Sequence, residues 1–583
     1  MKFHWSAPLL ALLLCSLLTA CGDVGPKKSV VYAEKIFTNG KIYTMDTALP
    51  VASAVAIGGG KILSVGDADS VERFAGAQTE IIDLARQTVL PGFHDLHVHP
   101  IFAGLFAFTC SVAQGADLEQ LLEKVKSCAE QAGDGDWITG GQWDTPALGQ
   151  VPNRKLLDAI VPDIPVFLRD TSGHSAWANT RALEVAGINS ETPDPEGGII
   201  ERDAMGEPTG LLREMAAAMV VRHIPPHSDE TLDAALATSL STMLANGLTT
   251  FTEAAIGFNA GAKRDTETYT RLADAGLLKQ RVRLCITWSP DDSEAEALLA
   301  AREQYTREGL SLDCVKMFLD GVPTDSHTAA MLEPYEGTVE GRSDEASVRG
   351  MLLMDQSILN EAVARFDKMG FTVKFHAAGD AAVRAGLEAI AYARGVNGMS
   401  NLRHNTGHCT FVAREDMPKA LAINATFEVS PYLWSPSPIN DSITQAVGEA
   451  RIKRVWPVRE LMESGALVVP GSDWAVVPSV NPWLAIEALV TREEPGGSVK
   501  NFGKEQAISV VQAIELFTVN SAKQRGMEDK LGQISEGMLA DLIVIDRDPY
   551  QIPVAELHRV VVNQTVINGA VVYDRGSGAV LND

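Results

Sequence analysis

The sequence lacks a surplus of positive charge, and this limits its partners. Its 583 residues include 49 Lys and Arg but 75 Asp and Glu, so the formal net charge is −26. Nucleic-acid binding needs a basic face for the phosphates, and we therefore expect no nucleic-acid partner. Aromatic residues are also few, at 6%, yet a chain of this length can bury a sizeable core without many of them.

Cysteine is scarce and follows no recognisable spacing. Of the seven Cys, two lie within the first 21 residues, and the other five form no C-x-x-C pair. An odd number without that spacing predicts neither a thiolate zinc site nor a disulfide framework. The sequence leaves open whether Cys110 pairs with Cys128.

Three other features are missing, and each absence argues against a class of protein. No G-x-S-x-G nucleophile elbow is present, which argues against a serine hydrolase. No glycine-rich dinucleotide turn follows a predicted strand, which disfavours a doubly wound sheet. Beyond the first 21 residues no uninterrupted apolar run reaches the roughly 18 residues of a membrane-spanning helix.

The first 20 residues are typical of a bacterial lipoprotein signal peptide. A short basic start precedes an apolar run over residues 9–18, which is too short to remain as a membrane span. The L-T-A-C order at residues 18–21 predicts cleavage before Cys21 and lipid attachment to its sulfur. We expect residues 21–30 to be a linker and the protein to be exported, touching the membrane only through this anchor. The outer membrane is favoured because Gly22 supplies no inner-membrane retention signal.

Short apolar runs separated by turns occur at both ends of the mature chain. They cover residues 31–90 and 530–583. Asn-Gly pairs at 39–40 and 568–569 are strong signals for two-residue hairpins. We expect the two ends to build one small β-sandwich domain.

The middle of the chain alternates apolar runs with helical stretches such as 357–369 and 381–394. Candidate strands cover residues 92–97, 248–253, 282–287, 314–318, 371–376, 401–408, 423–429 and 467–473. Eight strands alternating with helices predict the α/β class and a (β/α)8 barrel over residues 91–529. The interval 110–245 is too long for one crossover. We interpret it as an insertion that covers the substrate, because the functional loops of a barrel follow its strands.

Residues that can bind a metal stand at the ends of four of these strands. His97 and His99 end the first strand, and their i, i+2 spacing turns both imidazoles to one side. His376 ends the fifth strand, His408 the sixth and Asp473 the eighth. Neutral imidazole with carboxylate suits zinc and its first-row neighbours. The pattern predicts one or two divalent ions, with zinc favoured, at the C-terminal mouth of the barrel.

Six segments of the chain are similar to one known family. They are LPGFHDLHVH at 90–99, SGHSAWANTRAL at 172–183, PEGGIIERD at 195–203, GEPTGLL at 206–212, VKMFLDG at 315–321 and TAAMLEPY at 328–335. They resemble the amidohydrolase superfamily, in particular the amidohydrolase-3 family and its YtcJ-like branch, which includes N-substituted formamide deformylase. The resemblance covers about residues 31–575 and implies a metal-dependent hydrolase.

The resemblance also implies that Lys316 is a carboxylated lysine that bridges two metal ions. From the residues alone, Lys316 is a buried ion-pair partner, although burial also favours the neutral amine that reacts with carbon dioxide. Two segments depart from the family pattern. Residues 406–408 read T-G-H where the family commonly has I-E-H, so we expect a carboxylate near the ligands to be missing. Residues 324–327 stand where the family often has Gly-Ser around a substrate-facing Arg, so substrate preference is expected to differ.

The implied reaction is hydrolysis of an amide-type C–N bond, other than a peptide bond, in a small molecule. Asp473 would take a proton from metal-activated water and pass it to the leaving nitrogen. His174 is a candidate for holding the substrate, with a purely structural role in its turn as the alternative. Deamination, ester or lactone hydrolysis at the same site, and a non-catalytic lipid-anchored solute-binding protein, stay open. The oligomeric state is also open, a homo-oligomer included.

Overall fold

A sheet of eight parallel strands forms the centre of the protein. The computed structural model describes residues 31–577 except 114, 134, 338–344 and 435, together with 1, 579 and 580. Each strand of the central sheet pairs with the next one along the chain. The strands are β8 (Phe93–Val98), β15 (Leu248–Ile256), β16 (Arg281–Thr287), β17 (Leu310–Phe318), β18 (Thr372–Ala377), β19 (Asn405–His408), β20 (Thr426–Val429) and β21 (Leu467–Pro470). The predicted eight parallel strands of a barrel are confirmed.

The first and last strands meet just beyond their ends. The N–H of Asp473 donates to the carbonyl of His97 at 2.7 Å, and the N–H of His99 donates to the carbonyl of Trp474 at 2.6 Å. These bonds join the two edges of the sheet and bring two predicted site segments together. The last strand ends at Pro470, earlier than predicted, because the chain turns out of the extended conformation before Asp473, whose φ is 60°.

Helices pack against the outside of the barrel. They include α2 (Pro100–Leu105), α8 (Asp229–Ala245), α9 (Ala262–Asp274), α10 (Ser293–Ala300), α13 (Gln356–Lys368), α14 (Asp380–Asn397), α15 (Met417–Ala422), α16 (Pro438–Arg451), α17 (Val458–Glu463), α18 (Pro482–Thr491) and α19 (Val510–Glu515). The hydroxyl of Ser228 caps α8 by accepting from the N–H of Thr231. One cluster of buried apolar side chains spans neighbouring strands and the helices over them, and it includes Phe251, Leu284, Val315, Val373, Leu359 and Phe427.

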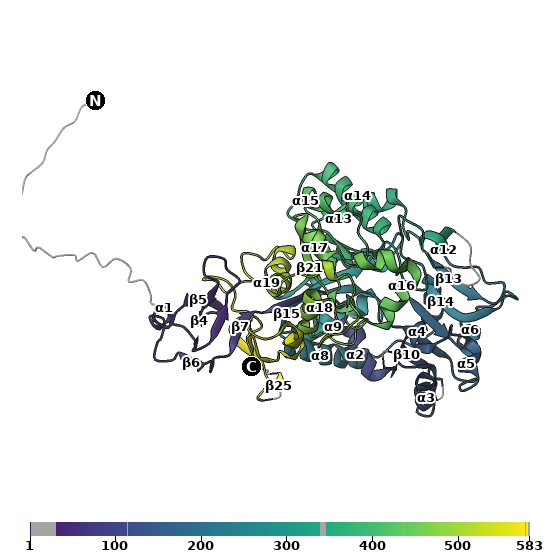
Figure 1. Ribbon diagram of the computed structural model, residues 1–583, viewed down its shortest axis with the longest axis horizontal. Coiled ribbons are helices and arrows are strands. Elements are labelled where there is room, and N and C mark those ends of the chain that lie inside the picture. The colour runs from purple at the N-terminus through teal and green to yellow at the C-terminus, as the bar shows by residue number, and fades with distance from the viewer. Residues whose placement is uncertain are drawn as a thin grey trace, which may run out of the picture.

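Residues between β8 and β15 form a second sheet of six strands. Its order is β13-β14-β12-β11-β10-β9. The strands are β9 (Cys110–Ser111), β10 (Ile138–Trp143), β11 (Val166–Asp170), β12 (Ser175–Ala178), β13 (Gly198–Arg202) and β14 (Pro208–Glu214). With helices α3 (Leu118–Ala129), α5 (Arg154–Asp158) and α6 (Thr180–Ala186) they lie at one end of the molecule, opposite the terminal strands (Figure 1).

Strands from the two ends of the chain lie together at the other end (Figure 1). One sheet has the order β25-β24-β23-β22-β7-β2-β3, and a neighbouring sheet has the order β5-β4-β1-β6. The bounds are β1 (Lys35–Thr38), β2 (Lys41–Tyr43), β3 (Val51–Ala52), β4 (Ala54–Gly58), β5 (Lys61–Gly66), β6 (Glu80–Asp83), β7 (Thr88–Pro91), β22 (Leu542–Ile545), β23 (Val562–Ile567), β24 (Ala570–Asp574) and β25 (Ala579–Val580). The two sheets share a buried cluster that includes Phe37, Val55, Leu542 and Val566.

The two Asn-Gly pairs make different turns. Asn568 and Gly569 have φ of 50° and 78° and join β23 to β24 as a hairpin, as predicted. Asn39 also has a positive φ, at 56°, but β1 pairs with β4 and β6, whereas β2 pairs with β3 and β7. The prediction of a hairpin at 39–40 is therefore wrong, because this turn passes the chain from one sheet to the other.

Two disulfides are present. Cys110 pairs with Cys128 and ties β9 to α3, and Cys285 pairs with Cys314 across the neighbouring strands β16 and β17. The sequence predicted no disulfide framework, and this is wrong because spacing along the chain does not reveal which cysteines the strands bring side by side. Within the described part of the chain, Cys409 is free and buried.

The described helices offer no membrane span, since none of them is both long enough and apolar enough to cross a bilayer. The predicted linker with Cys21 lies outside the described residues. So does the predicted signal peptide, apart from its first residue.

Candidate metal centre

The strand ends bring His97, His408 and Asp473 together. One ligand atom from each of these residues lies within 4.8 Å of the other two. The Nε2 of His97 is 3.6 Å from a carboxylate oxygen of Asp473, and the Nδ1 of His408 is 3.7 Å from the other oxygen. All three side chains are buried. Residues at the ends of the first and sixth strands, and one just past the eighth, therefore meet at one point.

The other two predicted imidazoles lie on either side of this point. The Nε2 of His99 is 3.3 Å from a carboxylate oxygen of Asp473. The ring of His376 lies 4.4 Å from the ring of His408, measured between centroids. His97, His99 and Asp473 thus form one side of the constellation, and His376 and His408 form the other.

Carboxylates hold three of the imidazoles through their Nδ1 atoms. The pairs are His97 with Glu428 at 2.5 Å, His99 with Glu253 at 3.2 Å, and His376 with Asp320 at 3.1 Å. A hydrogen bond at Nδ1 fixes the ring and leaves Nε2 available as a ligand atom. This arrangement is typical of histidines that bind metal ions.

Glu428 supplies the carboxylate that the segment before His408 lacks. A Cβ at Gly407 would lie 3.2 Å from the Oε1 of Glu428 and 2.7 Å from the carbonyl oxygen of Phe375. Glycine at this position therefore leaves the space through which Glu428 reaches His97 from the next strand. The expectation of a missing carboxylate is wrong, because β20 provides one.

Two of the converging residues have strained backbones. The φ of His408 is 68° and that of Asp473 is 60°, in the left-handed region that side chains other than glycine disfavour. Such a conformation costs about 1–3 kcal/mol and persists only where the surrounding structure enforces it. Strain of this kind concentrates at functional sites, and here it turns both side chains into the constellation.

Two buried lysines lie side by side on β17 and β18. Lys316 and Lys374 are register partners. Lys374 donates to Glu428 and, at 2.9 Å, to the carbonyl of Leu96. The Nζ of Lys316 is 3.4 Å from the Nε2 of His97, and no described carboxylate lies within ion-pair distance of it. Burial and the charge of Lys374 lower the pKa of Lys316 to about 7, so its amine loses a proton far more readily than a free lysine.

Three of the imidazoles are held in the neutral form. Burial lowers the pKa well below its usual value, and the positive charge of Lys316 lowers it further, for His97, His376 and His408. An imidazole must be neutral to bind a metal ion, because a protonated ring has no free lone pair. The local electrostatics therefore keep these rings in the state that a metal needs.

His99 is in a different electrostatic position. Burial lowers its pKa, but hydrogen bonds to Asp473 and Glu253 outweigh burial and raise the pKa to about 9. Two carboxylates thus favour a positive charge at this point. Either a proton on His99 or a metal cation beside it would balance the negative charges of these two carboxylates.

The second sheet places His174 next to the barrel residues. Its ring lies 4.7 Å from the ring of His376, and its Nδ1 is 2.8 Å from Glu214. Glu214 also accepts a hydrogen bond from the hydroxyl of Thr328 at 2.6 Å. Burial lowers the pKa of His174, but the charge of Glu214 outweighs burial and raises it. The pairing with Glu214 therefore favours the protonated form of His174.

Side chains of the second sheet are fixed to the loops that follow β17 and β21. The amide of Gln142 donates to the carbonyl of Ala475 at 2.8 Å. Thr145 and Arg213 donate to the carboxylate of Asp325 at 3.2 and 3.4 Å. The segment 324–327, which departs from the family pattern, thus serves to hold the second sheet over the barrel.

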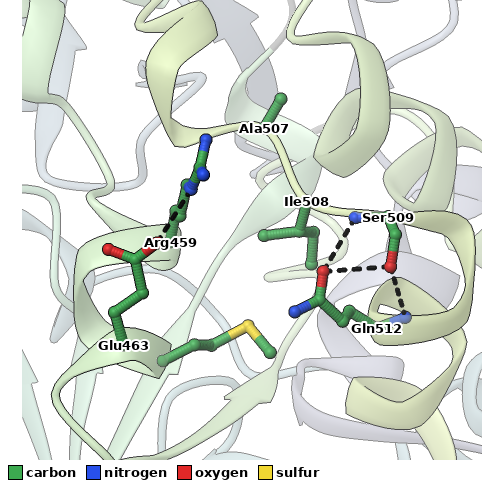
Figure 2. A pocket seen from close by; sticks show the side chains of 7 residues that line it. Arg459, Glu463, Ala507, Ile508, Ser509 and Gln512 are labelled. Atoms are coloured by element: carbon green, nitrogen blue, oxygen red, sulfur yellow. Dashed lines mark hydrogen bonds and ion pairs between the residues drawn. The ribbon is translucent and has the colours of Figure 1, made fainter.

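A surface hollow of about 420 Å³ lies elsewhere, between α17 and the start of α19 (Figure 2). Its lining residues are Arg459, Met462, Glu463, Ala507, Ile508, Ser509 and Gln512. The guanidinium of Arg459 pairs with Glu463 at 3.0 Å, and Gln512 bonds to Ser509 (Figure 2). The charges of Arg459 and Glu463 compensate each other, and none of the predicted site residues lines the hollow. The hollow is therefore not the candidate site.

Sequence reasoning missed the carboxylates that orient the imidazoles. Glu253 ends the second predicted strand, Glu428 lies within the seventh, and Asp320 follows the fourth by two residues. A carboxylate inside or directly after a buried strand is costly unless it is paired. Because of that cost, the position of these three carboxylates in the sequence already indicates that each has a polar partner in the folded protein.

The chain matches known proteins over most of its length. A model of the amidohydrolase family matches residues 80–573. The chain is 30% identical to YtcJ of Bacillus subtilis (strain 168), a protein provisionally named as an amidohydrolase, over 93% of this chain and 99% of that protein. It is 27% identical to N-substituted formamide deformylase of Arthrobacter pascens, over 92% of this chain and 98% of that protein.

A solved structure shares the fold. The crystal structure of an uncharacterized metal-dependent hydrolase from Pyrococcus horikoshii OT3 has a TM-score of 0.68 and 25% identity, and the match covers 89% of this chain and 99% of that chain. The family model and the Bacillus relative extend across both the barrel strands and the second sheet. This protein belongs to the amidohydrolase family.

Proposed function

We propose that this protein is a metal-dependent hydrolase that cleaves an amide-type C–N bond, other than a peptide bond, in a small molecule. The observation that carries the proposal is the convergence of His97, His408 and Asp473 in one buried spot. Neutral imidazole and carboxylate are the donors that zinc and related divalent ions prefer. Family membership supports hydrolysis, and the similar metal-dependent hydrolase supports the need for a metal.

We assign one or two divalent ions, with zinc favoured, to His97, His99, His376, His408 and Asp473. A metal bound there would lower the pKa of a water ligand to about 7 and polarise the scissile carbonyl. Lys316 fits the role of a carboxylated ligand, because its amine is buried, lies near His97 and has no described carboxylate as an ion-pair partner. The neutral form of this amine would add to carbon dioxide and release one proton. The product is a carbamate, whose negatively charged carboxylate group can bind a metal ion.

Asp473 is the proposed general base and acid. Burial raises its pKa, but the hydrogen bond to His99 outweighs burial and lowers the pKa, so the carboxylate is ionised. It can therefore accept a proton from water and deliver it to the leaving nitrogen. His174, whose protonated form is favoured by its pairing with Glu214, is proposed to hold the substrate carbonyl oxygen.

A substrate panel tests the reaction class. We expect purified protein to hydrolyse members of a set of N-formyl and N-acyl amines, and to lose this activity on chelation. Turnover of aminated rings or of lactones alone would assign the same residues to deamination or to ester chemistry. Binding of small molecules without metal and without turnover would favour a lipid-anchored solute-binding protein.

We also propose that the protein is exported and anchored to the cell envelope through a lipid on Cys21, with the outer membrane favoured. Labelled fatty acid should enter the wild type and not Cys21→Ala. Equal labelling of the two proteins would contradict the anchor. The barrel of the variant should stay folded, because Cys21 precedes every element of the described structure.

A further inference from the structure

Arg169 is a cation of the second sheet that lies close to the proposed metal ligands. It belongs to β11, and its guanidinium carbon is 5.0 Å from the ring centre of Phe258 and 5.7 Å from that of Phe167. The ring of Phe258 in turn stacks on His99, with 6.2 Å between centroids. Two successive ring contacts therefore connect Arg169 with one side of the constellation.

A second chain of contacts connects Arg169 with the other side. Its Nη1 donates to the carbonyl of Gly173 at 3.2 Å. The next residue, His174, has its ring 4.7 Å from His376. Arg169 thus lies beside both the proposed substrate-holding residue and the ring that stacks on His99.

No described carboxylate lies within ion-pair distance of the guanidinium of Arg169, although the charge of the neighbouring Asp170 acts on it. The side chain is half-buried, and the bond to Gly173 is its one side-chain hydrogen bond among the described residues. The neighbouring Asp170 uses its carboxylate for the hydroxyl of Ser172 and the N–H of Ser175. The positive charge is therefore available to a ligand.

Arg213, on β14 of the same sheet, shows how a structural arginine is satisfied. It donates to Glu201 at 3.4 Å, to Asp325 at 3.4 Å and to the hydroxyl of Ser175 at 2.9 Å. Charged side chains with little solvent exposure are normally paired in this way, because an uncompensated charge is costly to remove from water. Burial lowers the pKa of Arg169, and the charge of Asp170 offsets this only in part.

We propose that Arg169 binds a carboxylate of the substrate, so that the enzyme acts on amides that carry a carboxylate. The planar guanidinium presents parallel N–H groups that match the two oxygens of a carboxylate. Two phenylalanine rings lie at cation–π distance from the guanidinium, and only one of its N–H groups is used within the described chain. The inference rests on the proposed hydrolase for the identity of the reacting bond, but binding can be measured without turnover.

Calorimetry on the full mature protein tests the inference with two pairs of probes. N-acetylphenylalanine has its carboxylate on the amine side of the amide, N-phenylsuccinamate has it on the acyl side, and each is compared with its neutral carboxamide. We expect the wild type to bind at least one carboxylate about 10- to 100-fold more tightly than its carboxamide. Arg169→Met should abolish this preference, and Arg169→Lys should leave an intermediate one because it keeps the charge without the planar fork.

Arg181→Met is the matched control. Arg181 lies on α6, next to the same sheet, its side chain is 48% exposed, and it pairs with Glu184. This variant should keep the full preference, and melting curves should show all variants folded. Equal binding of carboxylate and carboxamide by the wild type in both pairs, or an undiminished preference in Arg169→Met, overturns the inference. A preserved preference together with no amide turnover would instead count against the proposed hydrolase and leave the Arg169 site in place.

Discussion

Lys316 and Lys374 occupy the same level of two neighbouring barrel strands, yet the protein treats their charges differently. Both side chains are almost completely buried, and the two residues are register partners on β17 and β18. Lys374 donates to the carboxylate of Glu428 and to a backbone carbonyl. Lys316 has an imidazole nitrogen of His97 as its nearest polar partner and no described carboxylate at ion-pair distance.

We infer from this difference that Lys374 is structural and that Lys316 has a chemical role. A buried ammonium group is stable only when a counter-charge compensates it. Lys374 has Glu428 as a direct ion-pair partner, whereas Lys316 has no described carboxylate at ion-pair distance. Burial lowers the pKa of both lysines, and the charge of Lys374 helps to lower that of Lys316 to about 7. We infer that carboxylation removes the charge of Lys316, whereas pairing with Glu428 balances that of Lys374.

The largest expected effect tests whether Asp473 serves chemistry or only pairs with the buried ring of His99. Asp473→Asn keeps the shape of the side chain and removes the base. We expect kcat to fall about 100- to 10,000-fold, or roughly 3 to 5 kcal/mol of barrier, with little change in Tm. Steady-state kinetics and a melting curve measure both quantities. A large fall in Tm with a nearly normal rate would make Asp473 a structural counter-ion.

Removal of the paired lysine should damage stability. Lys374→Met leaves the charge of Glu428 buried without its partner, and we expect the free energy of unfolding to fall by about 3–5 kcal/mol. Urea denaturation of the metal-free protein measures this. The double variant with Glu428→Gln should recover part of the loss, since it removes the stranded charge. Unchanged stability in the single variant would contradict the structural role of Lys374.

Removal of the unpaired lysine should damage metal binding instead. Lys316→Ala deletes the proposed carboxylated ligand, so we expect metal affinity to fall by at least about 10- to 100-fold. The free energy of unfolding of the metal-free protein should fall less than in Lys374→Met, because the loss of an uncompensated buried amine offsets part of the cost of the cavity. Short carboxylic acids should restore some metal and some rate. Wild-type metal content and turnover in this variant would remove Lys316 from the site.

The smallest expected effect concerns Gly407, which lies next to the carboxylate of Glu428. In Gly407→Ala the new methyl group would lie 2.7 Å from the carbonyl oxygen of Phe375 and 3.2 Å from Glu428. Overpacking of this kind costs about 1–3 kcal/mol of stability, and displacement of Glu428 should also loosen the ring of His97. Denaturation and metal titration of the variant test this. A variant as stable as the wild type, with equal metal affinity, would show that the glycine has no such role.

Periodicity was sufficient to predict the barrel and the convergence of its strand-end residues. The alternation of apolar strands and helices predicts where each strand ends, and parallel strands of a barrel all end at one face. His97, His408 and Asp473 come together for this reason, although His97 is far from the other two in the chain. The resemblance to the family, rather than the pattern, drew attention to Lys316.

Contacts between side chains of different strands could not be read from the sequence. Glu428 reaches His97 across a gap that exists because residue 407 is glycine, and Cys285 meets Cys314 because their strands share a register. Such pairings depend on three-dimensional adjacency, which spacing along the chain does not encode. The turn at 39–40 was misread for the same reason, since its strands belong to different sheets.

The central claim is that the converging residues hold a divalent metal that hydrolysis requires. Elemental analysis of purified mature protein, combined with amide turnover before and after chelation, tests it most directly. We expect one or two equivalents of zinc or a related metal, lost together with activity on chelation and regained together when metal is added back. Full turnover by protein that carries no metal would contradict the account.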